Sequence, residues 1–258
     1  MSSDDHPVLS ATARPADRTE VTGPEATDVY DVWEPPVGRP ARGTTIALVH
    51  GGFWRETYDR THLQPLAAAL AEDGFHVANL EYPRIGMPGG GWPGTGTAVA
   101  ARVESVVADP RLPAQVVVAG HSAGGHLALW LASQPSPPCA AALALGPAAD
   151  LRAVHALGLS QGAAEALLGS TPEADPEAWE RADPGRQHVE VPSAVVTGAR
   201  DEVIPEAVVT AYRETRRTDE PVRFATVATA DHFDLVDPTH EAYLTLLAEL
   251  EELGLHLR

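Results

Sequence analysis

The stretch that decides the fold is QVVVAGHSAGGHLALWLAS, residues 115–133. Its first five residues form an apolar run typical of a strand buried on both faces of a parallel sheet. The segment from His126 to Ser133 continues as a helix. The turn between them, residues 120–124, reads GHSAG, which is the G-x-S-x-G pattern of a nucleophile elbow. We therefore predict that Ser122 is a nucleophile on a strained turn, with the helix N-terminus behind it favouring negative charge.

Strands and helices alternate on both sides of this turn. We expect strands at 29–33, 44–50, 75–80, 115–119, 139–145, 193–197 and 222–227, and helices at 60–73, 97–108, 126–133, 205–217 and 237–252. This alternation predicts an α/β fold with a doubly wound, mostly parallel sheet that has helices on both faces.

The chain length of 258 residues fits one large domain. Residues 1–26 are rich in Pro, Asp, Thr and Ser and are expected to form a flexible arm, followed by a single domain at 27–258. Residues 150–190 break the alternation with several prolines. We expect this segment to be a small cap insertion above the carboxyl edge of the sheet, where such folds bind ligands.

The sequence HGGFW, residues 50–54, directly follows the second predicted strand. Acyl transfer produces a negatively charged oxygen that needs preorganised N–H donors, and two adjacent glycines leave their amides open to a substrate. We expect Gly51 and Gly52, together with the amide of Ala123, to form this oxyanion hole. Phe53 and Trp54 are candidates for a substrate-binding wall, although core packing fits them equally well.

The base and its carboxylate are expected in the chain order Ser, Asp or Glu, His. Asp201 follows a predicted strand in GARDEVIP, and His232 follows the last predicted strand in ADHFD. These two residues are the predicted partners of Ser122. Glu202 and Asp150 remain the alternative carboxylates, because each also lies just beyond a strand.

Composition excludes several classes of function. The formal charge of −18 disfavours binding to nucleic acids, and all eighteen basic side chains are arginine. The absence of lysine excludes a lysine Schiff base, a Ser–Lys dyad and a GxxxxGK[ST] phosphate loop. We expect no cofactor and no metal, because the sequence has no HExxH, no CxxC, no tight His/Asp cluster and no G-x-G-x-x-G after the first strands. With no signal peptide and no membrane-spanning apolar run, a cytoplasmic location is expected.

Four motifs together, HGGFW, GHSAGGH, GARDEVIP and DHFDLVDP, resemble the α/β-hydrolase superfamily from about residue 28 to 252. Within it, HGG followed by two aromatic residues looks like the HGGxW signature of the kynurenine formamidase (arylformamidase) group, and bacterial carboxylesterases have similar glycine motifs. The resemblance implies the same triad, Ser122, Asp201 and His232, and the same oxyanion hole.

The sequence thus predicts a serine hydrolase that cleaves a small acyl ester or an aryl formamide through an acyl-enzyme on Ser122. The alternatives are a peptidase or amidase of the same fold and an inactive hydrolase-like binding module. The expected partner is a small ester or amide, with no nucleic acid or membrane, and the expected state is a monomer or homodimer.

Overall fold

The computed structural model of the chain describes residues 6–253. Residues 1–5 of the predicted arm and residues 254–258 of the predicted domain lie outside this range. The described chain is built around an eight-stranded sheet of order β1-β2-β4-β3-β5-β6-β7-β8. The strands are β1 (Arg18–Val21), β2 (Val29–Trp33), β3 (Thr45–Val49), β4 (His76–Leu80), β5 (Val116–His121), β6 (Ala141–Leu145), β7 (Ser193–Gly198) and β8 (Val222–Val227).

The pairing of the strands confirms the predicted doubly wound, mostly parallel sheet. All neighbours from β4 to β8 are parallel. Only the β1–β2 and β2–β4 pairs are antiparallel. The order reverses around β3, so the carboxyl ends of the central strands meet at the edge where ligands bind in such sheets.

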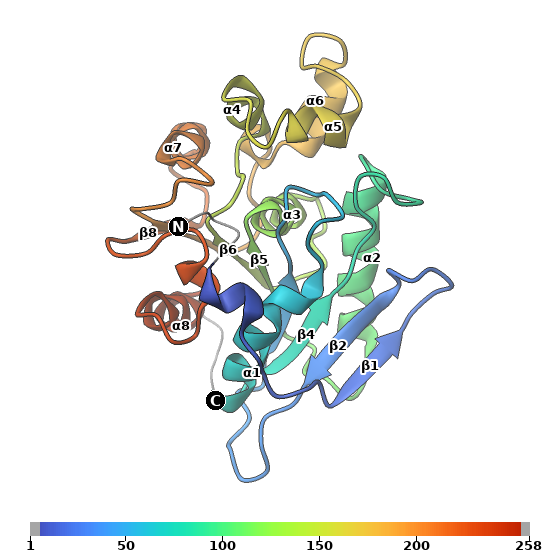
Figure 1. Ribbon diagram of the computed structural model, residues 1–258, viewed down its shortest axis with the longest axis vertical. Coiled ribbons are helices and arrows are strands. Elements are labelled where there is room, and N and C mark those ends of the chain that lie inside the picture. The colour runs from blue at the N-terminus through green and yellow to red at the C-terminus, as the bar shows by residue number, and fades with distance from the viewer. Residues whose placement is uncertain (1–5, 254–258) are drawn as a thin grey trace.

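Helices cover both faces of the sheet (Figure 1). They are α1 (Gln64–Glu72), α2 (Gly94–Ala108), α3 (Ala123–Ala132), α4 (Leu151–Ala156), α5 (Ala163–Leu168), α6 (Pro176–Ala182), α7 (Glu206–Glu214) and α8 (Ala242–Glu252). Short 3-10 turns lie at η2 (Pro7–Ser10), η3 (Arg60–Leu63), η4 (Pro184–Arg186) and η5 (Asp234–Val236).

The core has two halves because successive strand side chains point to opposite faces. Ile46 and Leu48 of β3 pack in the cluster that contains α1 and α8. Their neighbours Ala47 and Val49 pack in the cluster that contains α2 and α3. All five β3 residues are buried, which explains why the strand reads as one continuous apolar run.

Two differences from the sequence predictions concern the edge of the sheet and the turn at Ser122. Residues 18–21 of the expected flexible arm form the edge strand β1, which pairs with β2 from Arg18 opposite Val32 to Val21 opposite Val29. Backbone pairing orders this polar segment even though its side chains alternate between partly buried and exposed. The central helix also begins at Ala123 rather than at His126, since the helix starts directly behind Ser122.

Three short helices, α4, α5 and α6, occupy the segment between β6 and β7 for which a cap was predicted. They lie together at the top of the view in Figure 1, beyond α3. Leu151, Leu167 and Trp179 anchor them in the same apolar cluster as α2 and α3. Within residues 6–253, no helix has the length and apolar character needed to cross a bilayer.

Candidate active site

Ser122 lies on a tight turn between β5 and α3. Its backbone has φ 57° and ψ −116°, a left-handed conformation that costs free energy in a non-glycine residue. A Cβ on Gly120 would lie 2.0 Å from the carbonyl oxygen of Gly124, and a Cβ on Gly124 would lie 2.0 Å from that of Val49. Both elbow positions therefore require glycine for steric reasons, as the G-x-S-x-G pattern predicted.

His232 and Asp201 are joined by a direct contact. His232 Nδ1 lies 2.7 Å from Asp201 Oδ2, and both side chains are almost fully buried. The other oxygen, Asp201 Oδ1, accepts the backbone N–H groups of Val203 at 2.9 Å and Ile204 at 2.8 Å. Three hydrogen bonds thus fix the carboxylate, which in turn fixes the orientation of the imidazole ring.

Gly146 makes this contact possible from the neighbouring strand end. It follows β6 with φ +51°, and a Cβ there would lie 3.1 Å from both Asp201 Oδ2 and His232 Nδ1. No sequence motif predicted a role for this residue. A glycine directly after an apolar strand was the available signal, but nothing local indicates which side chains approach it.

His121 connects the elbow to the loop that carries His232. Its Nε2 lies 3.0 Å from the main-chain oxygen of His232, and the two rings are 4.5 Å apart. Because a carbonyl only accepts, Nε2 carries the proton and Nδ1 is left with a lone pair. Burial holds the pKa of His121 well below its usual value, and the nearby His232 lowers it further. His121 is therefore neutral beside the predicted base.

The predicted oxyanion loop lies against the elbow. A Cβ on Gly51 would be 2.9 Å from Ser122 Cβ, so this glycine gives the loop its close approach to Ser122. Gly52, Phe53 and Trp54 follow with φ of 105°, 49° and 59°. The amide of Ala123 is the first in α3 and has no helical carbonyl to donate to.

His50 holds the base of this loop. Its Nδ1 lies 2.9 Å from the oxygen of Gly51, its Nε2 lies 2.9 Å from Glu81 Oε1, and its ring stacks on Tyr82 at 4.2 Å. Burial alone would raise the pKa of Glu81, but the hydrogen bond and charge of His50 lower it to about 2. Since both ring nitrogens face oxygens, His50 has no free position for proton transfer and braces the loop.

A cavity of about 650 Å³ opens over Ser122 and His232. It is lined by residues of the oxyanion loop, the elbow, the His232 loop and the α4–α5 connection: Gly52, Phe53, Arg55, Thr57, Tyr58, His62, His121, Ser122, Ser160, Gln161, Val203, His232 and Phe233. Its volume is that of an ordinary small-molecule site. With Val203 from the loop between β7 and α7, the cavity thus brings together segments from five parts of the chain.

His62 forms part of the cavity wall. Its Nδ1 donates to the main-chain oxygen of Asp59 at 2.8 Å, which leaves Nε2 as an acceptor. Burial, followed by the nearby His50, lowers the pKa of His62 to about 4. Like His121, it is neutral at physiological pH.

The remaining site predictions are placed as follows. Phe53 lines the cavity, whereas Trp54 is fully buried, packs edge-on against His126 at 5.1 Å and is not a lining residue. Of the alternative carboxylates, Glu202 is exposed. Asp150 caps α4 by accepting the amide of Ala153 at 2.7 Å. Neither alternative occupies the position that Asp201 has beside His232.

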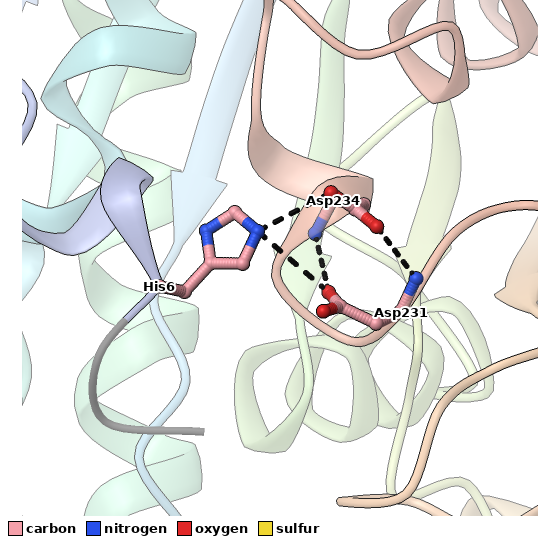
Figure 2. A group of neighbouring side chains, drawn as sticks. All are labelled: His6, Asp231 and Asp234. Atoms are coloured by element: carbon pink, nitrogen blue, oxygen red, sulfur yellow. Dashed lines mark hydrogen bonds and ion pairs between the residues drawn. The ribbon is translucent and has the colours of Figure 1, made fainter. Parts of the chain in front are cut away.

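The loop that carries His232 is also held from the N-terminal segment. Figure 2 shows His6 reaching Asp231 and Asp234, on either side of His232 and Phe233 in the sequence. His6 Nε2 lies 3.2 Å from Asp234 Oδ1, and its ring is 5.8 Å from that of Phe233. The N-terminal segment therefore contacts the active-site loop directly, which the sequence did not predict.

These three side chains are the one group within residues 6–253 whose ligand atoms are close enough for a metal, all within 4.8 Å of one another. The sequence predicted no tight His/Asp cluster, because His6 and Asp234 are 228 positions apart in the chain. Each side chain already has hydrogen bonds. His6 Nδ1 accepts the amide of Val8, Asp231 Oδ1 accepts those of Phe233 and Asp234, and Asp234 Oδ2 accepts that of Asp231. The group is therefore explained as a contact that orders the loop.

Comparisons with known proteins identify the family and the fold of the chain. A family model described as the alpha/beta hydrolase family matches residues 46–253. A comparison with curated proteins found no match. Among solved structures, a truncated carbohydrate esterase from gut microbiota is similar, with a TM-score of 0.77 and 14% identity over 93% of this chain and 99% of that chain.

Two further esterases have similar structures. Esterase B from Lactobacillus rhamnosis, inhibited by a tributyrin phosphonate, has a TM-score of 0.74 and 16% identity over 97% of this chain and 90% of that chain. A thermophilic esterase from the Planctomycetes species Thermogutta terrifontis, with propionate bound, has a TM-score of 0.70 and 19% identity over 92% of this chain and 93% of that chain. At these identities the similarity establishes the fold.

Proposed function

Because the chain belongs to the alpha/beta hydrolase family, we propose that it is a serine hydrolase that cleaves a small acyl ester through an acyl-enzyme on Ser122. One observation carries the proposal. The imidazole of His232, held at 2.7 Å by Asp201, lines the same cavity as the strained Ser122. Esterases among the similar structures support an ester as substrate.

In the proposed reaction, His232 Nε2 takes the hydroxyl proton of Ser122 as the oxygen attacks the substrate carbonyl. Asp201 accepts from Nδ1, which leaves Nε2 as the basic nitrogen and stabilises the imidazolium that forms. The same imidazolium then gives its proton to the leaving group. Water activated by His232 attacks the acyl-enzyme and regenerates Ser122.

The tetrahedral intermediates need donors for their negative oxygen. We assign this role to the amide of Ala123 and to the glycine amides of residues 51–52. The close approach of Gly51 to Ser122 and the free first amide of α3 support the assignment. One such donor contributes roughly 3 kcal/mol to the stability of the transition state.

An aryl formamide is the second candidate substrate. It reacts by the same steps, and the HGGFW loop beside Ser122 is the feature that favours it. The apolar part of the cavity wall, formed by Phe53, Val203 and Phe233, can contact an aryl group. We also propose that the protein acts in the cytoplasm, as a monomer or homodimer, on a small molecule.

Hydrolysis of p-nitrophenyl acetate and of N-formylkynurenine tests both forms of the proposal. We expect a measurable kcat/KM with the ester. The hypothesis that an aryl formamide is the preferred substrate requires a higher kcat/KM with N-formylkynurenine than with the ester. A fluorophosphonate probe should label the wild type and should not label Ser122→Ala. Label that persists in Ser122→Ala, or a wild type that is neither labelled nor active on either substrate, would refute the proposed nucleophile.

A further inference from the structure

The wall of the cavity over Ser122, as the structure describes it, has no acidic side chains, although the protein as a whole is strongly acidic. The chain has 36 acidic and 18 basic residues, yet none of the lining residues that the structure describes is Asp or Glu. Arg55 is the one arginine among them. The histidines that face it, His62 and His121, have lowered pKa values and are neutral. Among the other lining residues that the structure describes, Arg55 is the one with a permanent charge.

Arg55 also differs from most other arginines of the protein. Arg60, for example, contacts Asp31 at 2.7 Å, and Arg102 contacts Asp28 at 2.6 Å. Within residues 6–253, no carboxylate lies within ion-pair distance of Arg55, whose Nη2 donates instead to the main-chain oxygen of Ser160 at 2.9 Å. A guanidinium has five N–H donors, so this single contact leaves donors for a ligand.

The contact with Ser160 holds Arg55 between two strained segments. On one side Phe53 and Trp54 have φ of 49° and 59°, and on the other Ser160 and Gln161 have φ of 45° and 56°. Non-glycine residues persist in such conformations only where the surroundings enforce them, and they concentrate at ligand-binding sites. Phe53, Ser160 and Gln161 all line the cavity. The backbone of these two segments therefore holds the guanidinium in place at the cavity wall.

From the unpaired guanidinium in a cavity wall without acids, we infer that Arg55 binds a carboxylate of the substrate, so that the preferred substrates are anionic esters. The inference rests on the proposed function and names its substrate class. Guanidinium and carboxylate match in a planar, two-point hydrogen-bonded pair. The overall charge of −18 repels anions at long range, which favours a monoanion over a phosphate dianion.

Two matched pairs of esters test the inference. The first pair, 4-acetoxybenzoate and 4-acetoxybenzamide, places the charge on the leaving group. The second, the 4-nitrophenyl esters of succinate and of butyrate, places it on the acyl group. In at least one pair we expect the anionic ester to have a kcat/KM at least about 10-fold higher in the wild type, because a hydrogen bond to a charged group contributes that much or more.

Replacing the guanidinium should remove this preference. Arg55→Gln should lower kcat/KM for the preferred anionic ester by about 10- to 100-fold and change that of its neutral partner by less than about 3-fold. Arg55→Lys keeps the charge without the planar fork and should lose only part of the preference. Arg217→Gln is the control, because it removes the same charge from an exposed arginine that pairs with Asp219. It should leave both values unchanged.

A wild type without preference in either pair would overturn the inference. An equal loss of kcat/KM on anionic and neutral esters in Arg55→Gln would also overturn it, because Arg55 would then only hold the Ser160 segment.

Calorimetric titration of Ser122→Ala with 4-hydroxybenzoate and 4-hydroxybenzamide separates this inference from the proposed function. Binding of the carboxylate that is lost on adding Arg55→Gln supports the anion site even if no ester is hydrolysed. If the wild type hydrolyses esters without preferring the anionic ones, and Ser122→Ala does not bind 4-hydroxybenzoate, the proposed hydrolase function stands and the inferred anion site is refuted.

Discussion

His121 donates its Nε2–H to the main-chain oxygen of His232 at 3.0 Å, so the residue before Ser122 holds the loop that carries the proposed base. The elbow and the His232 loop are 111 positions apart in the chain, and the rings of His121 and Phe233, 5.7 Å apart, also bring them together. This bond links the residue next to Ser122 to the main chain of His232 and involves neither the Ser122 hydroxyl nor the His232 ring. His121 is thus a positioning residue in the proposed mechanism.

Removing this donor should slow the reaction while substrate binding is kept. We expect His121→Leu to lower kcat by about 10- to 100-fold with little change in KM, because a displacement of about 1 Å at a base has effects of this size. His121→Gln offers an amide donor near the same place and should recover much of kcat. Steady-state kinetics on p-nitrophenyl acetate measure both. A Gln variant as slow as the Leu variant would contradict the role of the hydrogen bond.

The carboxylate next to His232 can be identified by substitution. Asp201→Asn replaces the acceptor at His232 Nδ1 with a group that can favour the wrong tautomer, so kcat should fall by about 10³- to 10⁴-fold. Glu202→Gln changes the adjacent, exposed carboxylate and should keep wild-type kcat. A larger loss of kcat in Glu202→Gln than in Asp201→Asn would instead identify Glu202 as the carboxylate that orients His232.

Close packing behind Ser122 predicts a steric effect at Gly124. The added Cβ of Gly124→Ala would lie 2.0 Å from the oxygen of Val49 and 2.6 Å from that of His50. Since both atoms belong to the backbone, we expect a loss of about 3 kcal/mol or more in the free energy of unfolding, together with most of the activity. Urea denaturation measures this.

Gly158→Ala is the control for that substitution. Its Cβ would meet nothing within 4 Å, so only its φ of +62° should cost stability, by about 1 kcal/mol. Equal losses in the two variants would show that the contact behind Ser122 is not as tight as the structure has it.

Asp183 should make the stability of the protein depend on pH. The side chain is fully buried and accepts the amide of Gly185 at 2.9 Å. Burial, followed by the charge of Asp150, raises its pKa from 3.8 to about 7. Between these two values the folded protein holds a proton that the unfolded chain has released. The free energy of unfolding therefore decreases as pH rises through this interval.

Asp183→Asn cannot ionise and should escape that decrease. Relative to the wild type, it should gain about 2 kcal/mol in the free energy of unfolding between pH 5 and pH 8. Urea denaturation at the two pH values measures the gain. Asp175→Asn, at the exposed N-cap of α6, controls for the change of an Asp cap to Asn. A difference between Asp183→Asn and wild type that is the same at both pH values would contradict the raised pKa.

Local sequence determined much of the scaffold. The alternating segments specified the parallel strands, because a strand buried on both faces must be apolar along its length, as β3 is. The glycines around Ser122 specified the elbow, because only glycine tolerates the approach of the Gly124 and Val49 carbonyls. The strand ends also placed Asp201 and His232 at one edge of the sheet, where the structure joins them.

Tertiary structure alone decided which side chains surround those residues. Edge strand β1 is polar and depends on pairing with β2, so composition misidentified it as part of a flexible arm. Trp54 stands next to Phe53 in the sequence, yet one is buried against His126 and the other lines the cavity. The contact of Arg55 with Ser160 spans 105 positions. Such contacts depend on where separate loops meet in space, which no local pattern of residues encodes.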